Sequence, residues 1–452
     1  MRYSNSLLFL SLLAFSACDS STVPLSIDVT GIADGSGTVV VTGDGKTVLT
    51  CHDHCTTEVA HGASIVITAT PDDGSRFLAY SAPCGPDAAC TVMWTVPGHV
   101  SATFRPSGNF AFVSSKTVSM PLGDSAAASQ TAADAFCQTQ AGAAGLPGTY
   151  VAWLSTSDRT ALSKLQGSRG WIRPDGQPLA DTPSSMAHGE IYHPLELDEN
   201  GLAPNLDPAV PFTKWVGVYF TGTHADGVAS TDNCSDYTAN AGAITVGTGM
   251  NGPIWTDFPF GGSNIPDCSV PLSLACFEVG ASVDVTPHDG GRLAFLTDGK
   301  ITPSTDGGRA AADQLCAAEA SQAGLPGEYL ALMATSSKTD GAPLSRFDTS
   351  AGALPWVRLD GVALGAHPKD LGGRTLLAPV GVTPTLQYVD DYFWAGSNDP
   401  LTPATAADQN CADWTDASAK SESGSSDRSD LWFHALEGDL CQFPHRVLCL
   451  QK

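Results

Sequence analysis

Basic side chains are scarce in this sequence. It has 22 lysines and arginines against 47 aspartates and glutamates, and its formal net charge is −25. A protein that binds nucleic acid needs a basic surface to neutralise phosphates. No basic stripe occurs along the chain, so we expect no nucleic-acid partner. An acidic surface favours solubility and repels polyanions and anionic membranes.

Long apolar runs are lacking as well. No stretch reaches the ~18 consecutive apolar residues that a transmembrane helix needs. The short apolar segment 7–15 follows the basic start Met1-Arg2, which is typical of a secretion signal. Small residues and a cysteine, Ser16-Ala17-Cys18, close this segment.

That ending resembles the lipobox of bacterial lipoproteins, in which the cysteine is acylated and becomes the first mature residue. The resemblance implies that residues 1–18 are a lipoprotein signal peptide and lipobox. It also implies export and a membrane contact through a lipid on Cys18. The alternative is an ordinary secretion signal that is cleaved near Ala17.

The short motifs of common enzyme classes are also missing. The chain has no G-x-S-x-G elbow, no H-E-x-x-H and no Gly-rich phosphate loop between a strand and a helix. Its eleven histidines are scattered. Adjacent carboxylates such as Asp390 and Asp391 point to opposite faces if they lie on a strand. We therefore expect no enzyme, and a glycan hydrolase is the least favoured alternative.

Cysteines, in contrast, are present in an informative number. The chain has 13, and setting Cys18 aside leaves twelve, which suits six disulfides in an oxidising compartment. Cys51 and Cys55 flank His-Asp-His, a pattern that fits either a zinc site or a disulfide across a tight loop. A second close pair, Cys84 and Cys90, favours the disulfide interpretation.

Residues 23–105 consist of short alternating segments such as GTVVVTG and ASIVITATP, separated by Gly, Pro and Asp turns. This period of two predicts a small β-sandwich. The segment resembles the divergent internalin-type B repeat of bacterial surface proteins, and the resemblance implies a spacer or adhesive module. The residues that carry it include Gly35, Gly37, Gly62, Tyr80, the four cysteines and the ending VSATF.

The rest of the chain contains a duplication. ADAFCQTQAGAAGLPGTY at 133–150 and ADQLCAAEASQAGLPGEY at 312–329 share ten of eighteen positions. Further landmarks recur in the same order: GWIRPDG or PWVRLDG, WVG or WAG, DNC or QNC, and a late Cys pair. They define two modules, residues 110–279 (the first module) and 292–452 (the second module). The segment between them, GASVDVTPHDGG, is a predicted linker.

Each Ala-rich run predicts a helix. Asp124 or Ser125 offers an N-cap oxygen in the first module, and Asp306 does so in the second. A glycine and a proline end each helix in the phrase GLPG. Small residues spaced by four flank the helical cysteine, so this face can pack closely on a sheet.

The order of the four cysteines in each module resembles the C-type lectin-like fold. The resemblance implies that the first cysteine pairs with the last and that the two middle ones pair with each other. The implied pairs are Cys137–Cys276, Cys234–Cys268, Cys316–Cys449 and Cys411–Cys441. The shared motifs also look like an uncharacterised family of bacterial surface lipoprotein domains, related to the lectin-like and endostatin-like group. The expected fold class is thus mainly β with α+β modules: a β-sandwich repeat and two lectin-like domains.

In sugar-binding members of the lectin-like fold, oxygen side chains in the long loop and near the third cysteine hold calcium. The resemblance points to Asp226, Asp232 and Asp257 as candidate ligands in the first module. The second module lacks carboxylates at the corresponding loop and pre-cysteine positions. We expect no obligatory cofactor and regard calcium as a possible one.

The repeated WxRxDG motif supplies the other candidate site. An aromatic ring beside a charged pair can stack on a sugar and bind its hydroxyls. The alternative is that the tryptophan belongs to the core and that Asp-Gly forms a turn. The candidate ligand-binding residues are Trp171, Arg173, Asp175, Trp356, Arg358 and Asp360.

These observations predict a protein exported to the bacterial envelope, anchored by lipid at the outer membrane or cell surface. The expected activity is non-catalytic recognition or adhesion, with an extracellular glycan or protein as the ligand. The alternative is a structural envelope lipoprotein that has no specific ligand.

Overall fold

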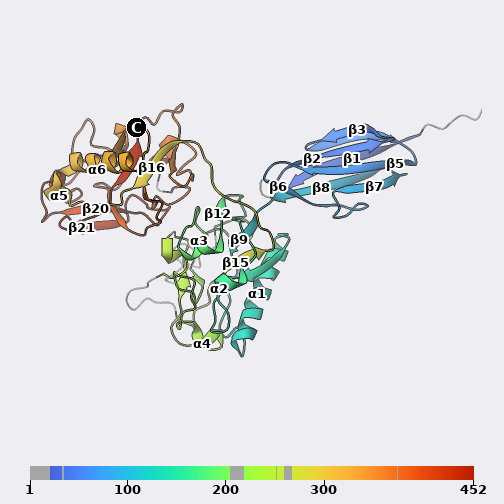
Figure 1. Cartoon of the computed structure of the whole chain (residues 1–452), viewed down its shortest axis with the longest axis horizontal. Coiled ribbons are helices and arrows are strands. Elements are labelled where there is room, and N and C mark those ends of the chain that lie inside the picture. The colour runs from blue at the N-terminus through green and yellow to red at the C-terminus, as the bar shows by residue number, and fades with distance from the viewer. Residues whose placement is uncertain (1–20, 33–34, 204–217, 251, 259–266, 374) are drawn as a thin grey trace, which may run out of the picture. The chain divides into compact units, whose positions relative to one another are not determined.

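The computed structural model describes residues 21–32, 35–203, 218–250, 252–258, 267–373 and 375–452. Cys18 and the predicted signal peptide 1–18 lie outside these ranges. The chain divides into two compact units, residues 1–107 and 108–452, and the second unit contains both modules (Figure 1). None of the helices in the described ranges is long and apolar enough to cross a membrane.

The N-terminal unit consists of two β-sheets packed face to face. Its strands are β1 (Thr22–Gly31), β2 (Gly37–Gly43), β3 (Lys46–Cys51), β4 (His54–Ala60), β5 (Ala63–Pro71), β6 (Ser75–Tyr80), β7 (Ala89–Trp94) and β8 (Gly98–Pro106). They form two four-stranded sheets with the orders β4-β1-β8-β6 and β3-β2-β5-β7 (Figure 1). β1 and β8 pair in parallel.

Alternating burial explains this packing. Ile65 and Ile67 of β5 are fully buried, whereas the residues between and beside them are less so. Leu25 and Ile27 of β1, from the opposite sheet, lie in the same hydrophobic core. Because a strand points successive side chains to opposite faces, one apolar face per sheet is enough to build this core. The predicted β-sandwich is confirmed.

The close cysteine pairs of this unit are disulfides. Cys51 bonds to Cys55, and Cys84 bonds to Cys90. The two cysteines of the CHDHC motif are bonded to each other and cannot act as thiolate ligands, which excludes a zinc site at this motif. His54 of this motif instead contacts Asp28.

The first module is built around a seven-stranded sheet. Its elements are β9 (Asn109–Val113), α1 (Ala126–Ala143), β10 (Thr149–Ala152), α2 (Ala161–Lys164), β11 (Trp171–Ile172), β12 (Pro178–Ala180), α3 (Pro183–Ala187), β13 (Tyr219–Phe220), α4 (Cys234–Tyr237), β14 (Val246–Gly247), η1 (Gly252–Trp255) and β15 (Ser273–Val279). The sheet has the order β12-β11-β9-β15-β13-β14, and β10 also pairs with β15. Helices α1 to α4 and strands β9, β12 and β15 are labelled in Figure 1.

The second module repeats this plan with shorter sheets. Its elements are β16 (Arg292–Leu296), α5 (Pro303–Asp306), α6 (Gly308–Gln322), β17 (Tyr329–Ala331), η2 (Pro343–Arg346), β18 (Trp356–Arg358), η3 (Pro368–Gly372), β19 (Tyr392–Trp394), α7 (Cys411–Trp414), β20 (Lys420–Ser425), β21 (Leu436–Leu440) and β22 (Leu448–Gln451). One sheet has the order β17-β22-β16-β18, and a second has the order β19-β20-β21. In both modules the first strand pairs antiparallel with the last, β9 with β15 and β16 with β22.

The long helix of each module is tied to that last strand. Cys137 in α1 bonds to Cys276 in β15, and Cys316 in α6 bonds to Cys449 in β22. The other two bonds are Cys234–Cys268 and Cys411–Cys441. These are the four pairs that the lectin-like resemblance implies. Mainly β structure with α+β modules is thus the observed fold class.

The helix ends agree with the sequence in one module and differ in the other. Ser125 caps α1, because its side chain accepts a hydrogen bond from the amide of Ala128 at 3.3 Å. The prediction that Asp306 caps the long helix of the second module is wrong. Asp306 ends the short helix α5 and accepts a hydrogen bond from the amide of Thr302, while Gly307 precedes α6.

The segment predicted as a linker is held by hydrogen bonds. The amide of Val283 donates to the carbonyl of Arg169 at 3.3 Å, and the Arg169 guanidinium lies 2.9 Å from Asp284. Farther along, the amide of Asp289 donates to the carbonyl of Gly361 at 2.9 Å. The segment is therefore bonded near both of its ends.

Candidate ligand pocket in the second module

Trp171 and Trp356 do not form the sugar-stacking surface that the sequence suggested. Both side chains are 0% exposed. The indole N–H of Trp171 donates to the carbonyl of Glu278 at 2.9 Å, and that of Trp356 donates to the carbonyl of Gln451 at 2.8 Å. A ring with no accessible face cannot stack on a ligand, so the alternative interpretation as core residues holds.

The charged residues of the same motif are internal pairs. Arg173 lies 2.5 Å from Asp175, and Arg358 lies 2.5 Å from Asp360. Each arginine also donates to a backbone carbonyl, Arg173 to Pro194 and Arg358 to Pro379. The charged groups are thus paired within the protein, and of the four only Asp175 has a substantially exposed side chain. With both rings buried, the stacking site that the sequence suggested is not formed.

The three candidate calcium ligands of the first module do not converge. Asp257 lies 3.0 Å from His224, whereas Asp226 accepts a hydrogen bond from the amide of Val228. Asp232 is exposed. Across the described ranges, no group of three or more His, Cys, Asp or Glu residues is placed to hold a metal ion. The described residues therefore do not support calcium at Asp226, Asp232 and Asp257.

A pocket that the sequence did not predict lies in the second module. It has a volume of about 110 Å³ and is lined by Gly372, Gly373, Asn398, Asp399, Pro400, Leu431, Trp432, Phe433 and His434. Three separate segments contribute these residues: the end of η3, the loop after β19, and the connection between β20 and β21. Small-molecule sites also combine apolar walls with a few polar groups, but their volumes are larger, roughly 300–1,000 Å³.

Hydrogen bonds hold the walls in place. The indole N–H of Trp432 donates to the carbonyl of Gly373 at 3.1 Å, which joins two of the three segments. Within the loop, one carboxylate oxygen of Asp399 accepts from the amide of Leu401 at 2.7 Å. Leu401 and Leu431 are 56% and 40% exposed, so apolar side chains border the pocket as well.

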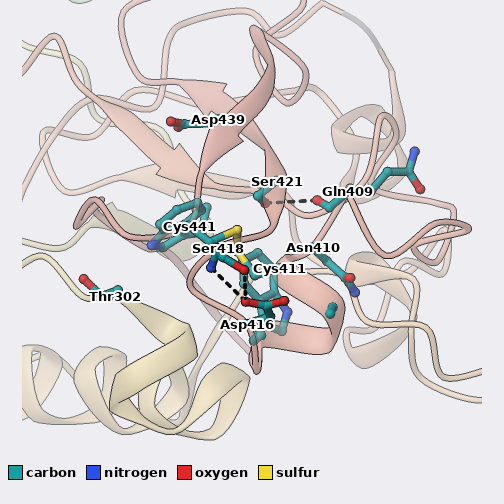
Figure 2. Close-up of a disulfide and its surroundings, with 12 residues drawn as sticks. Thr302, Gln409, Asn410, Cys411, Asp416, Ser418, Ser421, Asp439 and Cys441 are labelled. Atoms are coloured by element: carbon teal, nitrogen blue, oxygen red, sulfur yellow. Dashed lines mark hydrogen bonds between the residues drawn. A yellow bond between two sulfur atoms is a disulfide. The ribbon is translucent and has the colours of Figure 1, made fainter.

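Figure 2 shows the Cys411–Cys441 disulfide and, near it in the chain, Gln409. Beside this disulfide, the hydroxyl of Ser421 donates to the carbonyl of Gln409 at 3.0 Å. The side-chain amide of Gln409 in turn donates to Asn398 at 3.3 Å. The chain before Cys411 is thereby fixed between strand β20 and the pocket.

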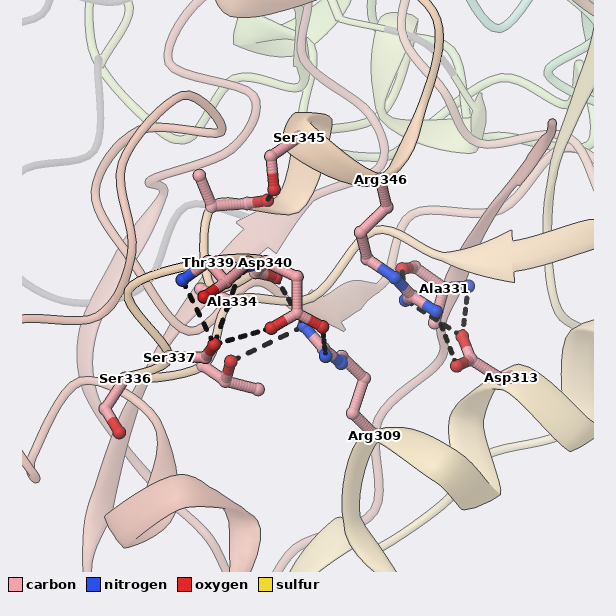
Figure 3. Close-up of polar contacts among 12 residues, drawn as sticks. Arg309, Asp313, Ala331, Ala334, Ser336, Ser337, Thr339, Asp340, Ser345 and Arg346 are labelled. Carbon is pink, nitrogen blue, oxygen red and sulfur yellow. Dashed lines mark hydrogen bonds and ion pairs between the residues drawn. The ribbon is translucent and has the colours of Figure 1, made fainter.

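Two ion pairs join helix α6 to the segment 340–346 (Figure 3). Arg309 lies 2.7 Å from Asp340, and Arg346 lies 2.7 Å from Asp313 of α6. Leu344 lies in the segment between Asp340 and Arg346, and its amide donates to the carbonyl of Pro400 at 3.0 Å. The pairs therefore hold the segment on which the pocket residue Pro400 rests.

The first module has an equivalent of one of these pairs. Lys164 lies 2.5 Å from Asp134, which occupies the α1 position that Asp313 occupies in α6. The Lys164 side chain is 0% exposed. Burial lowers the pKa of this amine, although Asp134 acts in the opposite direction.

His434 is the most unusual polar group of the pocket. Its Nδ1 lies 2.9 Å from Glu422 Oε2, and its Nε2 lies 3.2 Å from Glu437 Oε1. The side chain of Glu422 is 9% exposed, and burial raises the pKa of its carboxyl. A buried acid beside an imidazole in a concave site is a common mark of a functional position.

The sequence analysis also did not predict a left-handed turn that both modules contain. Cys411, Ala412, Asp413 and Trp414 all have φ between 52° and 64°, and the corresponding residues 234–237 of the first module have φ between 53° and 61°. Asp413 accepts hydrogen bonds from the amide of Ser336, at 2.7 Å, and from its hydroxyl. The repeated sequence N-C-x-D was the available signal, because Asn410 accepts from the amide of Asp413.

Comparison with known families identifies one part of the chain. Residues 33–108 match the divergent InlB B-repeat domain. This match confirms the resemblance of the N-terminal unit, and the B-repeat domain accounts for its sandwich of short strands. No curated protein matches the chain.

Proposed function

We propose that this protein is an exported lipoprotein of the bacterial envelope that recognises an extracellular ligand through the pocket of its second module. The ligand is a glycan or a protein. The B-repeat domain serves as the spacer between the membrane anchor on Cys18 and the two modules. Both modules are lectin-like domains in this proposal.

The disulfide pattern supports the lectin-like assignment. In each module one bond ties the long helix to the last strand, and a second bond lies in the irregular half. Twelve of the 13 cysteines are paired, which suits an oxidising compartment. The thirteenth, Cys18, is the residue that lipidation would use.

The observation that carries the recognition role is the pocket itself. Asn398, Asp399 and His434 bring polar groups from two segments to one concavity. Leu431 adds exposed apolar surface to its lining, and Leu401 lies next to the lining residue Gly372. Recognition sites combine these two kinds of surface, because apolar contact supplies affinity and a few polar groups supply orientation.

The charge arrangement favours binding over hydrolysis. Glycoside hydrolases need one carboxyl as acid and another as base or nucleophile, at opposite sides of the bond. Glu422 and Glu437, the carboxylates closest to His434, both face that one imidazole. Two carboxylates that face the same imidazole are not placed at opposite sides of a glycosidic bond, so we propose non-catalytic recognition.

A glycan array and a panel of extracellular proteins test this proposal. The mature full-length protein is expected to bind a restricted set of probes, and Asp399→Asn is expected to weaken that binding by about fivefold or more. The substitution keeps the shape of the side chain and removes its charge. Asp72→Asn, an exposed position in the B-repeat domain, is the matched control and should bind normally.

Each outcome separates the candidate functions. Binding that a chelator abolishes would restore a metal-dependent lectin mechanism. Binding that is equal in the two variants would place the site elsewhere. No binding to any probe would leave the structural envelope role as the better explanation.

A further inference from the structure

The size of the pocket in the second module limits what can enter it. Its volume is about 110 Å³, and a cavity of about 150 Å³ is known to hold a single benzene ring. A sugar ring with its hydroxyl groups is larger than benzene. The pocket therefore fits one projecting group of about four or five non-hydrogen atoms, such as the end of a side chain, rather than a whole ligand.

A carboxylate oxygen in the pocket lining is free to bind a donor. Asp399 lines the pocket and is half-buried. Its Oδ1 accepts a hydrogen bond from the amide of Leu401 at 2.7 Å, which fixes the orientation of the carboxylate. Its Oδ2 has no hydrogen-bond partner among the described residues. A ligand that presents a donor can therefore bind Asp399 without displacing an internal hydrogen bond.

Acids outnumber positive groups around the pocket. Among the described residues that line it, His434 alone can carry a positive charge. Glu422 Oε2 lies 2.9 Å from Nδ1 of this ring, and Glu437 Oε1 lies 3.2 Å from its Nε2. Asp399 and Glu437 by themselves outnumber the single charge that the imidazole can bear. The field in the pocket is thus negative in either protonation state of the ring, and it favours a cationic ligand.

Two buried atoms at this wall lack hydrogen-bond partners. Neither Glu422 Oε2 nor His434 Nδ1 has a partner among the described residues, in spite of the 2.9 Å that separates them. A buried carboxylate oxygen without a donor raises the free energy of the folded state. A positive group in the adjoining pocket reduces this cost by electrostatic attraction over a short distance. Binding of a cation therefore stabilises the wall.

The border of the pocket is apolar. Leu431 lines the pocket and is 40% exposed, and Leu401, which is 56% exposed, lies next to the lining residue Gly372. Leu431 also has φ 48°, a left-handed conformation that is rare for a bulky residue and common at ligand sites. An apolar border around an acidic interior matches a side chain with a methylene stem and a charged tip. Lysine has this form.

We propose that this pocket takes the ammonium group of a lysine side chain that an extracellular protein presents. The ammonium donates to Asp399 Oδ2, and the methylene stem lies against Leu401 and Leu431. This inference rests on the proposed function of the pocket, because it names the ligand class of that same site. The net charge of −25 also favours the approach of a basic protein.

Arginine is a poorer match than lysine for this site. A guanidinium is a rigid planar fork that pairs best with both oxygens of a carboxylate. One oxygen of Asp399 is already engaged by the amide of Leu401, so the carboxylate offers a single acceptor. An ammonium is a compact point charge that needs only one such acceptor.

Titration of the mature full-length protein with short blocked peptides tests the proposal. The peptides differ only in their central residue, which is lysine, norleucine, Nε-acetyllysine or arginine. The nuclear magnetic resonance signal of the Trp432 indole N–H reports binding at the pocket, because this group joins two of its walls. The lysine peptide should bind about tenfold more tightly than the norleucine and acetyllysine peptides, which cannot form the charged hydrogen bond. It should also bind more tightly than the arginine peptide.

Two variants locate the charge that is recognised. Asp399→Asn should weaken binding of the lysine peptide by about fivefold or more and remove most of its advantage over the norleucine peptide. Asp348→Asn is the matched control. Asp348 is exposed, accepts a hydrogen bond from the amide two residues later, as Asp399 does, and does not line the pocket. This control should bind the lysine peptide normally.

Several results would overturn the inference. Among them are no binding of the lysine peptide, equal binding of the lysine and norleucine peptides, and lysine binding that Asp399→Asn leaves unchanged. Tighter binding of the acetyllysine peptide, or of N-acetylglucosamine as a separate probe, would assign the pocket to a neutral acetamido group. Tighter binding of the arginine peptide would assign it to a guanidinium.

Failure of this inference differs from failure of the proposed function. If an array ligand binds and its binding depends on Asp399 while the lysine peptide does not bind, the pocket is a recognition site for another group. If neither the arrays nor the peptides give binding, both proposals fail together.

Discussion

At the scale of single residues, Arg358 shows how surroundings set the role of a side chain. It is 1% exposed, pairs with Asp360 and donates to the carbonyl of Pro379 at 2.8 Å. A guanidinium remains buried only when its donors are satisfied. Gly361 follows with φ 86°, a left-handed conformation that closes the turn with little strain. Burial and internal pairing therefore give the WVRLDG motif a structural role.

His193 of the first module is another residue whose burial has a measurable consequence. It is 2% exposed, and its Nδ1 lies 2.8 Å from the carbonyl of Pro178. Burial lowers its pKa from 6.5 to about 4. The folded protein thus holds this ring neutral at pH values at which an unfolded chain would protonate it.

We expect His193 to reduce stability in acid. Between pH 6.5 and about 4 the unfolded state binds a proton that the folded state does not. The free energy of unfolding therefore decreases as the pH is lowered through this range. The loss attributable to His193 should reach about 3 kcal/mol at pH 4. Urea unfolding at pH 7 and pH 4 measures it, with His193→Gln as the comparison. An equal loss in both proteins would contradict this role.

At the scale of elements, the left-handed turns α4 and α7 are the most strained features that the two modules share. Left-handed conformations cost an L-residue roughly 1–2 kcal/mol each. Both turns persist because a disulfide begins at their first residue and an Asp in the third position binds a serine of a distant loop. The disulfide and the Asp–Ser hydrogen bonds thus offset the backbone strain, because a strained conformation persists only where surrounding bonds hold it.

We expect Ala412→Gly to stabilise the protein by about 0.5–1 kcal/mol, because glycine adopts φ 52° without the steric cost. Ala317→Gly, at an exposed position of helix α6, is the matched control. There glycine should destabilise by about 1 kcal/mol. Thermal unfolding followed by circular dichroism measures both. The same sign of change in the two variants would argue against a left-handed turn at residue 412.

At the scale of the whole molecule, the cross-links differ greatly in span. The bonds Cys137–Cys276 and Cys316–Cys449 close sequence separations of 139 and 133 residues, whereas Cys51–Cys55 closes four. A bond across a long loop removes more conformational freedom from the unfolded chain than a bond across a short one. The long bonds should therefore account for most of the stabilisation by disulfides.

Replacing both members of each pair by alanine tests this ranking. Removal of Cys137–Cys276 should cost about 5 kcal/mol, and removal of Cys51–Cys55 about 2 kcal/mol, on the chain-entropy argument. Chemical denaturation without reductant provides the measurement. If both double variants lost the same stability, native-state strain rather than chain entropy would dominate.

The sequence by itself determined the local architecture, the sandwich strands and the two long helices. Alternation in segments such as ASIVITATP led to the sandwich, because strand periodicity is a property of neighbouring residues. The duplicated phrase with its cysteine led to two modules, each with one long helix. Family resemblance added the pairing of the cysteines, which spacing alone left open among three arrangements.

The tertiary structure alone decided what the chemical groups do. Trp171, Arg358 and Asp226 have the residue types of a binding site, yet burial, internal pairing and separation in space remove them from that role. The pocket instead joins residues 372–373, 398–400 and 431–434, which no local pattern connects. Burial and proximity depend on contacts between residues far apart in the chain, and local sequence patterns do not specify those contacts.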